Sequence, residues 1–362
     1  MAIRKVGDCR ILGPLGKGGM AQVYRGLHEG LQREVAIKEL APDAAKSNEQ
    51  LSRFKRESMA LAGFRHQHIV TLYDLVEKND GLYMVMELVD GPTLGELIKE
   101  APLPADAVAV IGLQLASALE HAHFHRVVHR DLKPGNVMIN SWGDVKLMDF
   151  GIAQQEDLDR LTKTGMAVGT PSYMSPEQVM GGMVDPRSDI YSLGVMLYEA
   201  LAGKRPFTGA NPGEVFAKVT TGKKEKLVKA AAKVPKALAE VIEKAMALKP
   251  EDRYPDATAL RRAFERLLAR LDRSPSAVLV AFLRARKRLT ESEALARLSH
   301  TELTQLSQLS PQELAAVRGP RWGLALVFGV LLGVAIASFD GWWPRVQSFF
   351  TSSSSSSSAP RP

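Results

Sequence analysis

One stretch of the chain holds several side chains that could act together on a phosphoryl group. It reads HRDLKPGN from His129 to Asn136, and the tripeptide DFG begins at Asp149. Asp131 could orient a hydroxyl group and accept its proton, and Lys133 could lie against a transferring phosphate. Asn136 and Asp149 offer the hard oxygen ligands that Mg²⁺ prefers. The set predicts phosphoryl transfer from MgATP to a hydroxyl group.

The two motifs resemble the catalytic loop and the metal-binding loop of the eukaryotic-like (Hanks-type) protein kinases, and Lys133 is typical of their serine/threonine branch. The resemblance extends from about Arg10 to Leu268 and covers residues 10–268 as one kinase domain. It implies an α+β, bilobal protein kinase fold: a β-rich N-lobe with the αC helix (residues 10–88) and a mainly α-helical C-lobe (residues 89–268). The implied cofactors are ATP and Mg²⁺, which Mn²⁺ could replace.

A glycine-rich segment near the N-terminus is the first of the supporting motifs. Gly16 and Gly18 carry no Cβ, so backbone amides there could approach a triphosphate. The third glycine of the usual pattern is replaced by Ala21, and the motif alone could be an ordinary hairpin. In the context of the resemblance, the whole segment is expected to contact ATP: Leu15, Gly16, Lys17, Gly18, Gly19, Met20, Ala21, Gln22 and Val23.

A predicted strand and a predicted helix supply a charged pair. Lys38 ends the β-branched run VAIK, and Glu57 lies in the helical stretch that follows. An isolated glutamate would be read as part of a solvated helix face. The resemblance instead pairs Glu57 with Lys38, which would bind the ATP phosphates.

The segment from Leu82 to Gly91 is predicted to be a strand that ends in a glycine turn. It resembles the hinge between the lobes, with Met86 as gatekeeper and with backbone groups of Glu87 and Val89 offered to adenine. The side chains expected to sandwich the ring could equally be plain core residues: Leu15, Val23, Ala36 and Met138.

The resemblance assigns four further residues to structure and substrate positioning: Thr170, Glu177, Asp189 and Arg253. The segment from Gly169 to Glu177 is similar to the peptide-positioning loop, although Ser175 replaces the usual alanine. Thr170 would bridge Asp131 and Lys133. Asp189 would brace the catalytic loop, and Arg253 would pair with Glu177; both would be structural ions.

Regulation by phosphorylation is predicted around Arg130. An arginine before the catalytic aspartate commonly receives a phosphate from the activation loop, where Thr162 and Thr164 are the candidate hydroxyls. His129 is expected to be a structural ring near Phe150 rather than a base.

Composition limits the remaining possibilities. The 362 residues suit one two-lobed domain and an appendage, and Cys9 is the only cysteine, so an internal disulfide is excluded. The N-terminus does not resemble a signal peptide. The net charge of +7 suits an anionic membrane or acidic partners, and there is no nucleic-acid motif. A zinc site at His121 and His125 is disfavoured.

The chain changes character after Leu268. Residues 269–320 are predicted to be a basic, helical juxtamembrane segment, with a cluster at Arg284, Arg286, Lys287 and Arg288 and capping boxes beginning at Thr290 and Ser310. Two interpretations remain open: a helix pair that contacts lipid headgroups or a partner, and a solvated spacer.

Residues 322–339 form an uncharged apolar run flanked by tryptophans. As a helix it would be about 27 Å long, enough for one C-terminal transmembrane span. Because a kinase needs cytosolic ATP, the chain is expected to be a single-pass protein of the cell membrane with its kinase domain in the cytoplasm. Residues 340–362 would then be a short, Ser-rich tail outside. Small residues four apart predict a homodimer stripe: Ala325, Gly329, Gly333 and Ala337.

The predicted function is ATP-dependent phosphorylation of protein Ser/Thr hydroxyls by a membrane-anchored signalling kinase, with autophosphorylation of its activation loop. Two alternatives stay open. One is a pseudokinase that acts as a membrane scaffold, which the presence of Lys38, Asp131 and Asp149 disfavours. The other is a small-molecule phosphotransferase on the same fold.

Overall fold

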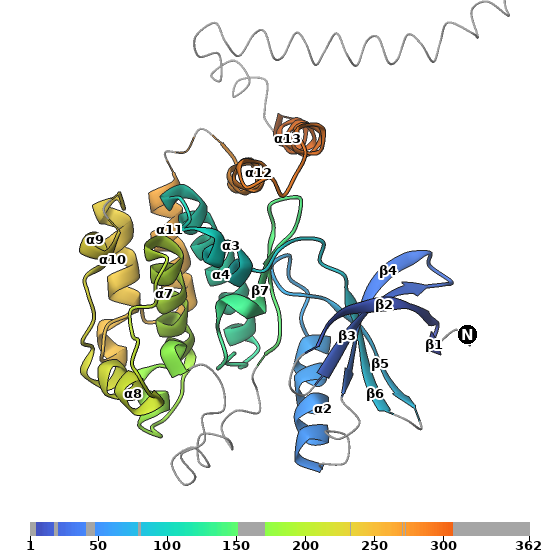
Figure 1. Cartoon of the computed structure of the whole chain (residues 1–362), viewed down its shortest axis with the longest axis horizontal. Coiled ribbons are helices and arrows are strands. Elements are labelled where there is room, and N and C mark those ends of the chain that lie inside the picture. Colours follow the sequence, from blue (N-terminus) through green and yellow to red (C-terminus); the bar gives the residue numbers. More distant parts are fainter. Residues whose placement is uncertain are drawn as a thin grey trace, which may run out of the picture. The chain divides into compact units, whose positions relative to one another are not determined.

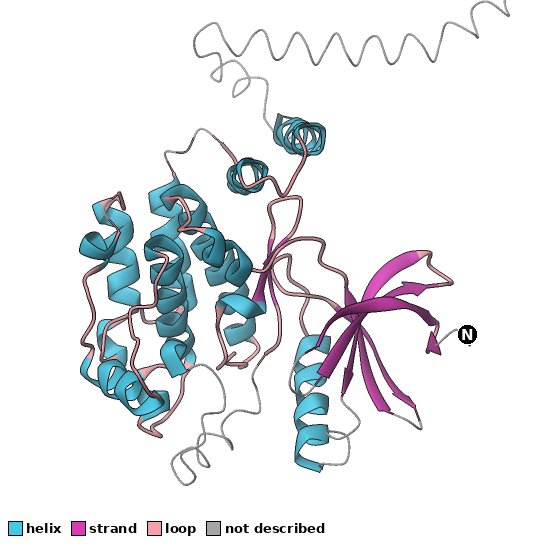
Figure 2. Ribbon diagram, in the orientation of Figure 1, coloured by secondary structure: helices cyan, strands magenta, loops and turns pink. Residues whose placement is uncertain are grey.

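The computed structural model describes residues 5–17, 21–40, 48–78, 81–150, 171–231, 233–269, 271 and 273–306. Among them, a β-rich N-terminal part with one long helix precedes a mainly helical part, which agrees with the predicted order of lobes (Figures 1 and 2). The first 301 residues form one compact unit.

The N-terminal part is built on an antiparallel six-stranded sheet of order β1-β2-β3-β4-β6-β5. Its strands are β1 (Lys5–Val6), β2 (Cys9–Lys17), β3 (Ala21–His28), β4 (Arg33–Leu40), β5 (Leu72–Lys78) and β6 (Gly81–Glu87). Helix α2 (Asn48–Ala62) packs against β5.

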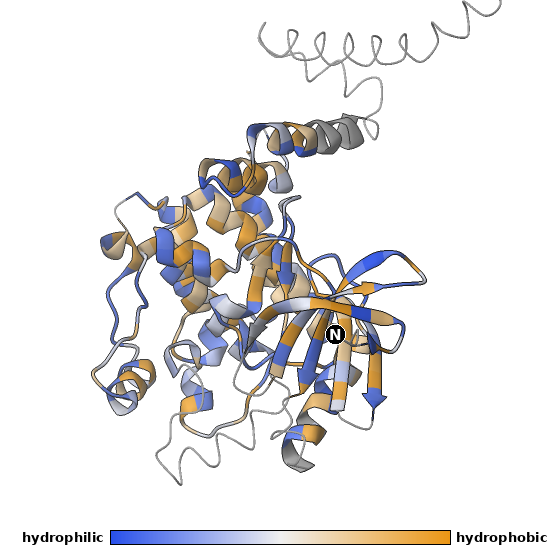
Figure 3. Cartoon of the chain, turned by 45° about the vertical axis from the view of Figure 1, so that its right-hand side comes forward, coloured by the Kyte–Doolittle hydropathy of each residue, from blue (hydrophilic) through white to orange (hydrophobic). Residues whose placement is uncertain are grey.

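Alternation along β4 separates the two faces of this sheet. Val35 and Ile37 are fully buried in a small core with Val85, whereas Lys38 points to the opposite face. The alternating hydropathy of the strands is visible in Figure 3. The strand therefore presents Lys38 toward α2 and the helical part.

The helical part begins with α3 (Leu94–Glu100) and α4 (Ala105–Phe124), followed by the short turn η1 (Pro134–Asn136) and the hairpin β7 (Val137–Ile139) and β8 (Val145–Leu147). The elements after residue 170 are η2 (Pro171–Tyr173), α6 (Pro176–Val179), α7 (Pro186–Ala202), α8 (Pro212–Thr221), α9 (Leu227–Ala230), α10 (Lys236–Ala245), η3 (Pro250–Asp252), α11 (Ala257–Leu268), α12 (Pro275–Ala285) and α13 (Glu291–Leu306).

Helix α4 is the centre of this part because it is apolar on nearly every side, as expected of a helix surrounded by others. It packs against α7, α11 and α12. A Cβ at Gly112 would lie only 2.5 Å from the ring of Phe264, so this glycine permits the close approach of α4 and α11.

The predicted ion pair between Glu177 and Arg253 is present and buried. Two guanidinium nitrogens of Arg253 donate to the two carboxylate oxygens of Glu177 at 2.7 and 2.8 Å. Burial opposes the charged form, but bonds from Arg253 and Ser188 outweigh it and lower the pKa of Glu177. The pair joins α6 to the segment after η3.

The packed core continues beyond Leu268, where a change of character was expected. Helix α12 buries Val278, Leu279, Phe282 and Leu283 in the main core. A solvated spacer does not describe α12, so that interpretation is wrong for this helix, whereas contact with lipid headgroups or a partner stays a prediction. Its residues are apolar because α4 covers them.

Helix α13, which follows α12, begins with the capping box that was predicted at Thr290. Thr290 Oγ1 accepts the amide of Glu293 at 3.3 Å, and Glu293 Oε2 accepts the amide of Thr290 at 2.9 Å, which is a capping box. In the part of the chain that the structure describes, no helix combines the length and apolarity needed to cross a bilayer. The predicted span, tail, homodimer stripe and second capping box lie outside the described residues.

Candidate functional site

Lys38 joins three separate elements of the fold. Its Nζ lies 2.9 Å from Glu57 Oε1 on α2 and 2.8 Å from Asp149 Oδ1, two residues after β8. The predicted pairing of Lys38 with Glu57 is thereby formed, and the contact with Asp149 extends it into the helical part. The Lys38 and Glu57 side chains are 13% and 16% exposed, whereas that of Asp149 is 46% exposed.

The charges in this cluster support one another. Burial disfavours the Lys38 ammonium, but the carboxylates of Asp149 and Glu57 outweigh it and raise the pKa of Lys38. Burial likewise opposes the Asp149 carboxylate, yet Lys38 lowers the pKa of Asp149. For Glu57, burial dominates and raises the pKa. Lys38 thus stays cationic and Asp149 stays anionic, as phosphate and metal binding require.

The catalytic-loop candidates form a second cluster. Lys133 Nζ donates to Asp131 Oδ2 at 2.6 Å, and Asn136 Nδ2 donates to the Asp131 carbonyl at 2.9 Å and to Oδ2 at 3.2 Å. These bonds use the Asn136 amide nitrogen, so Oδ1 is the atom of this side chain that could bind a metal. An amide oxygen and the Asp149 carboxylate are suitable ligands for Mg²⁺, so the donor set fits this metal.

Asp189, at the start of α7, binds the backbone of the catalytic loop through both of its carboxylate oxygens. Its Oδ1 accepts the Arg130 amide at 2.9 Å, and its Oδ2 accepts the His129 amide at 2.8 Å. Arg130 has a φ of +67°, a backbone conformation that residues other than glycine rarely adopt. The two bonds accepted by Asp189 stabilise this strained backbone and are the contacts that the predicted bracing role requires.

Two histidines support the same loop. The ring of His129 is fully buried, lies 4.6 Å from the ring of Phe150 between centroids, and contacts the Met148 carbonyl at 3.0 Å. The prediction of a structural ring is therefore confirmed. His123 was not assigned a partner from the sequence, and its Nε2 lies 2.8 Å from Asp189 Oδ2.

The predicted nucleotide-binding residues come from four strands and the hinge. Gly16 on β2 pairs with Val23 on β3, and a Cβ added at Gly16 would meet no atom within 4 Å. Ala21 and Gln22 also lie on β3, and the backbone of Lys17 ends β2. Leu15 is 50% exposed and Ala36 is buried. Met138 lies on β7, and Val89 follows β6.

The Glu87 amide donates to the Thr71 carbonyl at 2.9 Å, so of its two backbone groups the carbonyl is the one that stays predicted to face adenine. Its side chain binds Lys146 Nζ on β8 at 2.6 Å, a pair that sequence reasoning missed. The sequence offered only a weak signal for this pair, namely that Lys146 lies in the strand shortly before the DFG motif. Gly18, Gly19, Met20, Thr162, Thr164 and Thr170 lie outside the described residues.

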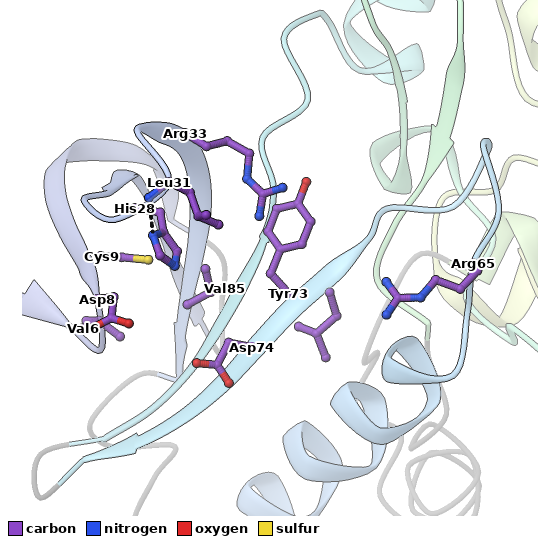
Figure 4. Close-up of a pocket in the computed structure, with 11 residues that line it drawn as sticks. Val6, Asp8, Cys9, His28, Leu31, Arg33, Arg65, Tyr73, Asp74 and Val85 are labelled. Atoms are coloured by element: carbon purple, nitrogen blue, oxygen red, sulfur yellow. Dashed lines mark hydrogen bonds between the residues drawn. The ribbon is translucent and has the colours of Figure 1, made fainter.

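A cavity of about 320 Å³ lies elsewhere on the N-terminal part (Figure 4). Its lining includes Cys9, Tyr73 and Val85, and the Arg33 guanidinium lies 3.7 Å from the centroid of the Tyr73 ring. Val85 projects from the sheet face opposite to that of Lys38. The cavity includes none of the predicted nucleotide-binding or catalytic residues.

Comparisons with known proteins agree with this geometry. A family model described as "Protein kinase domain" matches residues 9–264. The chain is 41% identical over 250 residues to serine/threonine-protein kinase PrkC of Bacillus subtilis, covering 68% of this chain but 38% of that protein. It is 36% identical over 296 residues to PknL of Mycobacterium tuberculosis, covering 82% of this chain and 73% of PknL.

Among solved structures, the kinase domain of Mycobacterium tuberculosis PknI matches with a TM-score of 0.58 and 28% identity. The match covers 73% of this chain and 97% of the PknI structure. The two-part fold described above is thus the fold of that domain.

Replacement of Asp189 by asparagine tests the bracing of the loop. The amide offers one acceptor oxygen where two are used, so a buried backbone N–H loses its partner. We expect the free energy of unfolding to fall by about 1–3 kcal/mol and kcat to fall on the order of 10²-fold, because the loop is displaced. Urea denaturation and steady-state kinetics measure both. Asp185→Asn, at the partly exposed N-cap of α7, is the control. A parental kcat for Asp189→Asn would contradict the role.

Proposed function

Because the chain belongs to the protein kinase family, in the branch of bacterial serine/threonine kinases, we propose that it transfers phosphate from ATP to serine and threonine hydroxyls of proteins. The observation that carries this proposal is the pair of contacts made by Lys38. One cation from the sheet bridges a helix carboxylate and the DFG aspartate, and the Asp131 cluster supplies a hydroxyl-orienting group.

Each side chain has a role that follows from its position. Lys38, held by Glu57, would bind the α- and β-phosphates of ATP. Asn136 Oδ1 and the Asp149 carboxylate would hold Mg²⁺, which supplies positive charge to the phosphates. Asp131 would orient the acceptor hydroxyl and accept its proton, while Lys133 would neutralise charge on the transferring group. Most of the catalysis would be positioning and charge stabilisation.

An inactive scaffold is the weaker candidate. A pseudokinase would need a missing or misplaced charged group, whereas Lys38, Asp131 and Asp149 are present and joined by short contacts to their expected neighbours. We therefore assign the active enzyme.

Removal of either central charge tests the assignment. Lys38→Met or Asp149→Asn should lower phosphate transfer to a protein substrate by at least ~10³-fold, because each deletes a charge that acts on phosphate or metal. Radiolabel transfer by the purified full chain measures this. Lys5→Met, which removes an exposed lysine paired with Glu29, is the matched control and should leave activity intact. Near-parental activity in either site variant would overturn the assignment.

We also propose that the kinase phosphorylates its own activation loop at Thr162 or Thr164. Arg130 supports this, because among the described residues its guanidinium has no carboxylate within salt-bridge distance, while its backbone is fixed by Asp189 and Gln178. A phosphate carries nearly two negative charges and would form charge-assisted bonds with such an arginine.

Mass mapping of the active enzyme should find phosphate on Thr162, Thr164 or both. Thr162→Ala/Thr164→Ala should then lose most of its activity toward an added substrate, and Arg130→Ala should lose it in the same way even when the loop is phosphorylated. Full activity of the double alanine variant would exclude this regulation.

The composition of residues 322–339 supports a further proposal, that the chain is anchored in the cell membrane by one span. The kinase domain would face cytosolic ATP, and residues 340–362 would lie outside. The small residues at 325, 329, 333 and 337 would let two spans pack closely and bring two kinase domains together.

This arrangement predicts the behaviour of one variant in membranes. Gly329→Ile/Gly333→Ile should weaken dimerisation in crosslinking experiments and lower phosphorylation of Thr162 and Thr164 in cells, because bulky side chains separate the helices. Val330→Ile, a conservative change off the stripe, should alter neither. Unchanged crosslinking of a normally inserted double isoleucine variant would show that the stripe does not mediate association.

A further inference from the structure

Residues 274–297, called the brace below, lie beyond the region that the family model matches, which ends at residue 264. They comprise α12 and the start of α13, and Figures 1 and 2 show these helices beside the turn between β7 and β8. This turn, residues 140–144, also contacts the hinge. The contacts on its two sides connect the brace to the expected nucleotide site.

The first contact is made by the N-terminus of α12. Gly143 in the turn has a φ of +80°, and a Cβ there would lie 2.3 Å from the carbonyl oxygen of Ser276. The two backbones are therefore in direct contact. Gln114 of α4 holds the same turn, because its amide group binds the Gly143 carbonyl at 3.3 Å and the Val145 amide at 2.7 Å.

The second contact is made by Arg297 on α13. Its guanidinium lies 4.9 Å from the centroid of the Trp142 ring, and Nη2 donates to Ser141 Oγ at 3.2 Å. A second guanidinium nitrogen donates to the Glu293 carbonyl at 3.3 Å, which holds the side chain against its own helix. Two consecutive residues of the turn are thus bound by one arginine.

A third contact anchors the connection between the two helices. Arg286 donates to the carbonyls of Ala101 and Pro102 at 3.1 and 2.8 Å, and Arg288 forms an ion pair with Glu100. Glu100 ends α3, and Ala101 and Pro102 follow it. The brace is therefore held at the start of α12, at the connection between α12 and α13, and at Arg297.

On its other side, the turn, together with the end of β7, is hydrogen-bonded to the hinge residues Asp90 and Pro92. The Ser141 amide donates to the Asp90 carbonyl at 3.1 Å, and the Ile139 amide donates to the Pro92 carbonyl at 3.0 Å. A Cβ at Gly91 would lie 1.9 Å from the Ile139 carbonyl oxygen, so the hinge is in contact with β7. Met138, expected to contact adenine, lies within this strand.

We propose that Arg297 and Trp142 are positioning residues for the nucleotide. They hold the β7–β8 turn, through Ser141 and its bond to Asp90, at the distance from the hinge that ATP binding requires. The brace thereby makes α12 and the start of α13, as far as Arg297, part of the nucleotide site. This inference rests on the proposed use of ATP, and it adds residues that the kinase motifs do not include.

The test compares nucleotide affinity and turnover in variants of the full chain. Arg297→Ala and Trp142→Ala should each raise KM for ATP, and the Kd for MgADP measured by calorimetry, about threefold to tenfold, the scale of one cation–π contact and one hydrogen bond. At saturating ATP, kcat should stay within about twofold, because the reacting groups are not touched. The double variant should be no worse than either single variant.

Three further variants separate positioning from general stability. Arg284→Ala removes an exposed arginine that pairs with Glu291 and does not touch the turn, so its Kd should match the parent. Trp142→Phe keeps an aromatic face and should restore most of the affinity. Ser141→Ala removes only the acceptor hydroxyl and should give a smaller rise even if Arg297→Ala does not fold.

An unchanged Kd in Arg297→Ala, Trp142→Ala and Ser141→Ala would overturn the proposal, as would an equal loss in Arg284→Ala. A lower melting temperature without a change in Kd would assign the brace to stability alone. If the parent binds MgADP but transfers no phosphate, the proposed kinase reaction fails while the Kd series still decides the role of the brace.

Discussion

The contacts of Lys38 are the interaction on which the arrangement of the site depends. Taking an ammonium and a carboxylate out of water costs several kcal/mol for each ion, so such a group persists only where opposite charges surround it. Lys38 meets this condition by binding Glu57 and Asp149 at once. If α2 and the DFG segment both moved away, the buried Lys38 ammonium would be left without a partner. The side chain of Lys38 therefore fixes the positions of the sheet, α2 and the DFG segment relative to one another.

The charge balance of the site suits the ligands that the family uses. Along the contacts described above, two ammonium groups, Lys38 and Lys133, meet the carboxylates of Glu57, Asp149 and Asp131. The excess of carboxylate favours a divalent cation, and Asp149 is exposed enough to reach one. The pKa shifts of Lys38 and Asp149 preserve both charges. The same carboxylates that stabilise Lys38 thus prepare the site for metal and phosphate.

The resemblance carried by the motifs was sufficient to predict the charged framework of the fold. It implied the pairs Lys38–Glu57 and Glu177–Arg253 and the position of His129 near Phe150, all of which the structure contains. The docking of α12 could not be predicted in this way. Its sequence is apolar without a distinctive pattern, and only the surface of α4 decides whether such a helix is buried.

The neighbours of the hinge are set by backbone hydrogen bonds, which sequence patterns do not reveal. The amide of Glu87 is bound to Thr71 because β5 runs beside the end of β6, a fact of strand pairing. The hinge then has fixed neighbours on both sides: β5 and Lys146 hold Glu87, and the β7–β8 turn holds Asp90. Helices α12 and α13 contain none of the kinase motifs, yet both contact the β7–β8 turn. By our proposal, these helices therefore help to fix the geometry of the hinge.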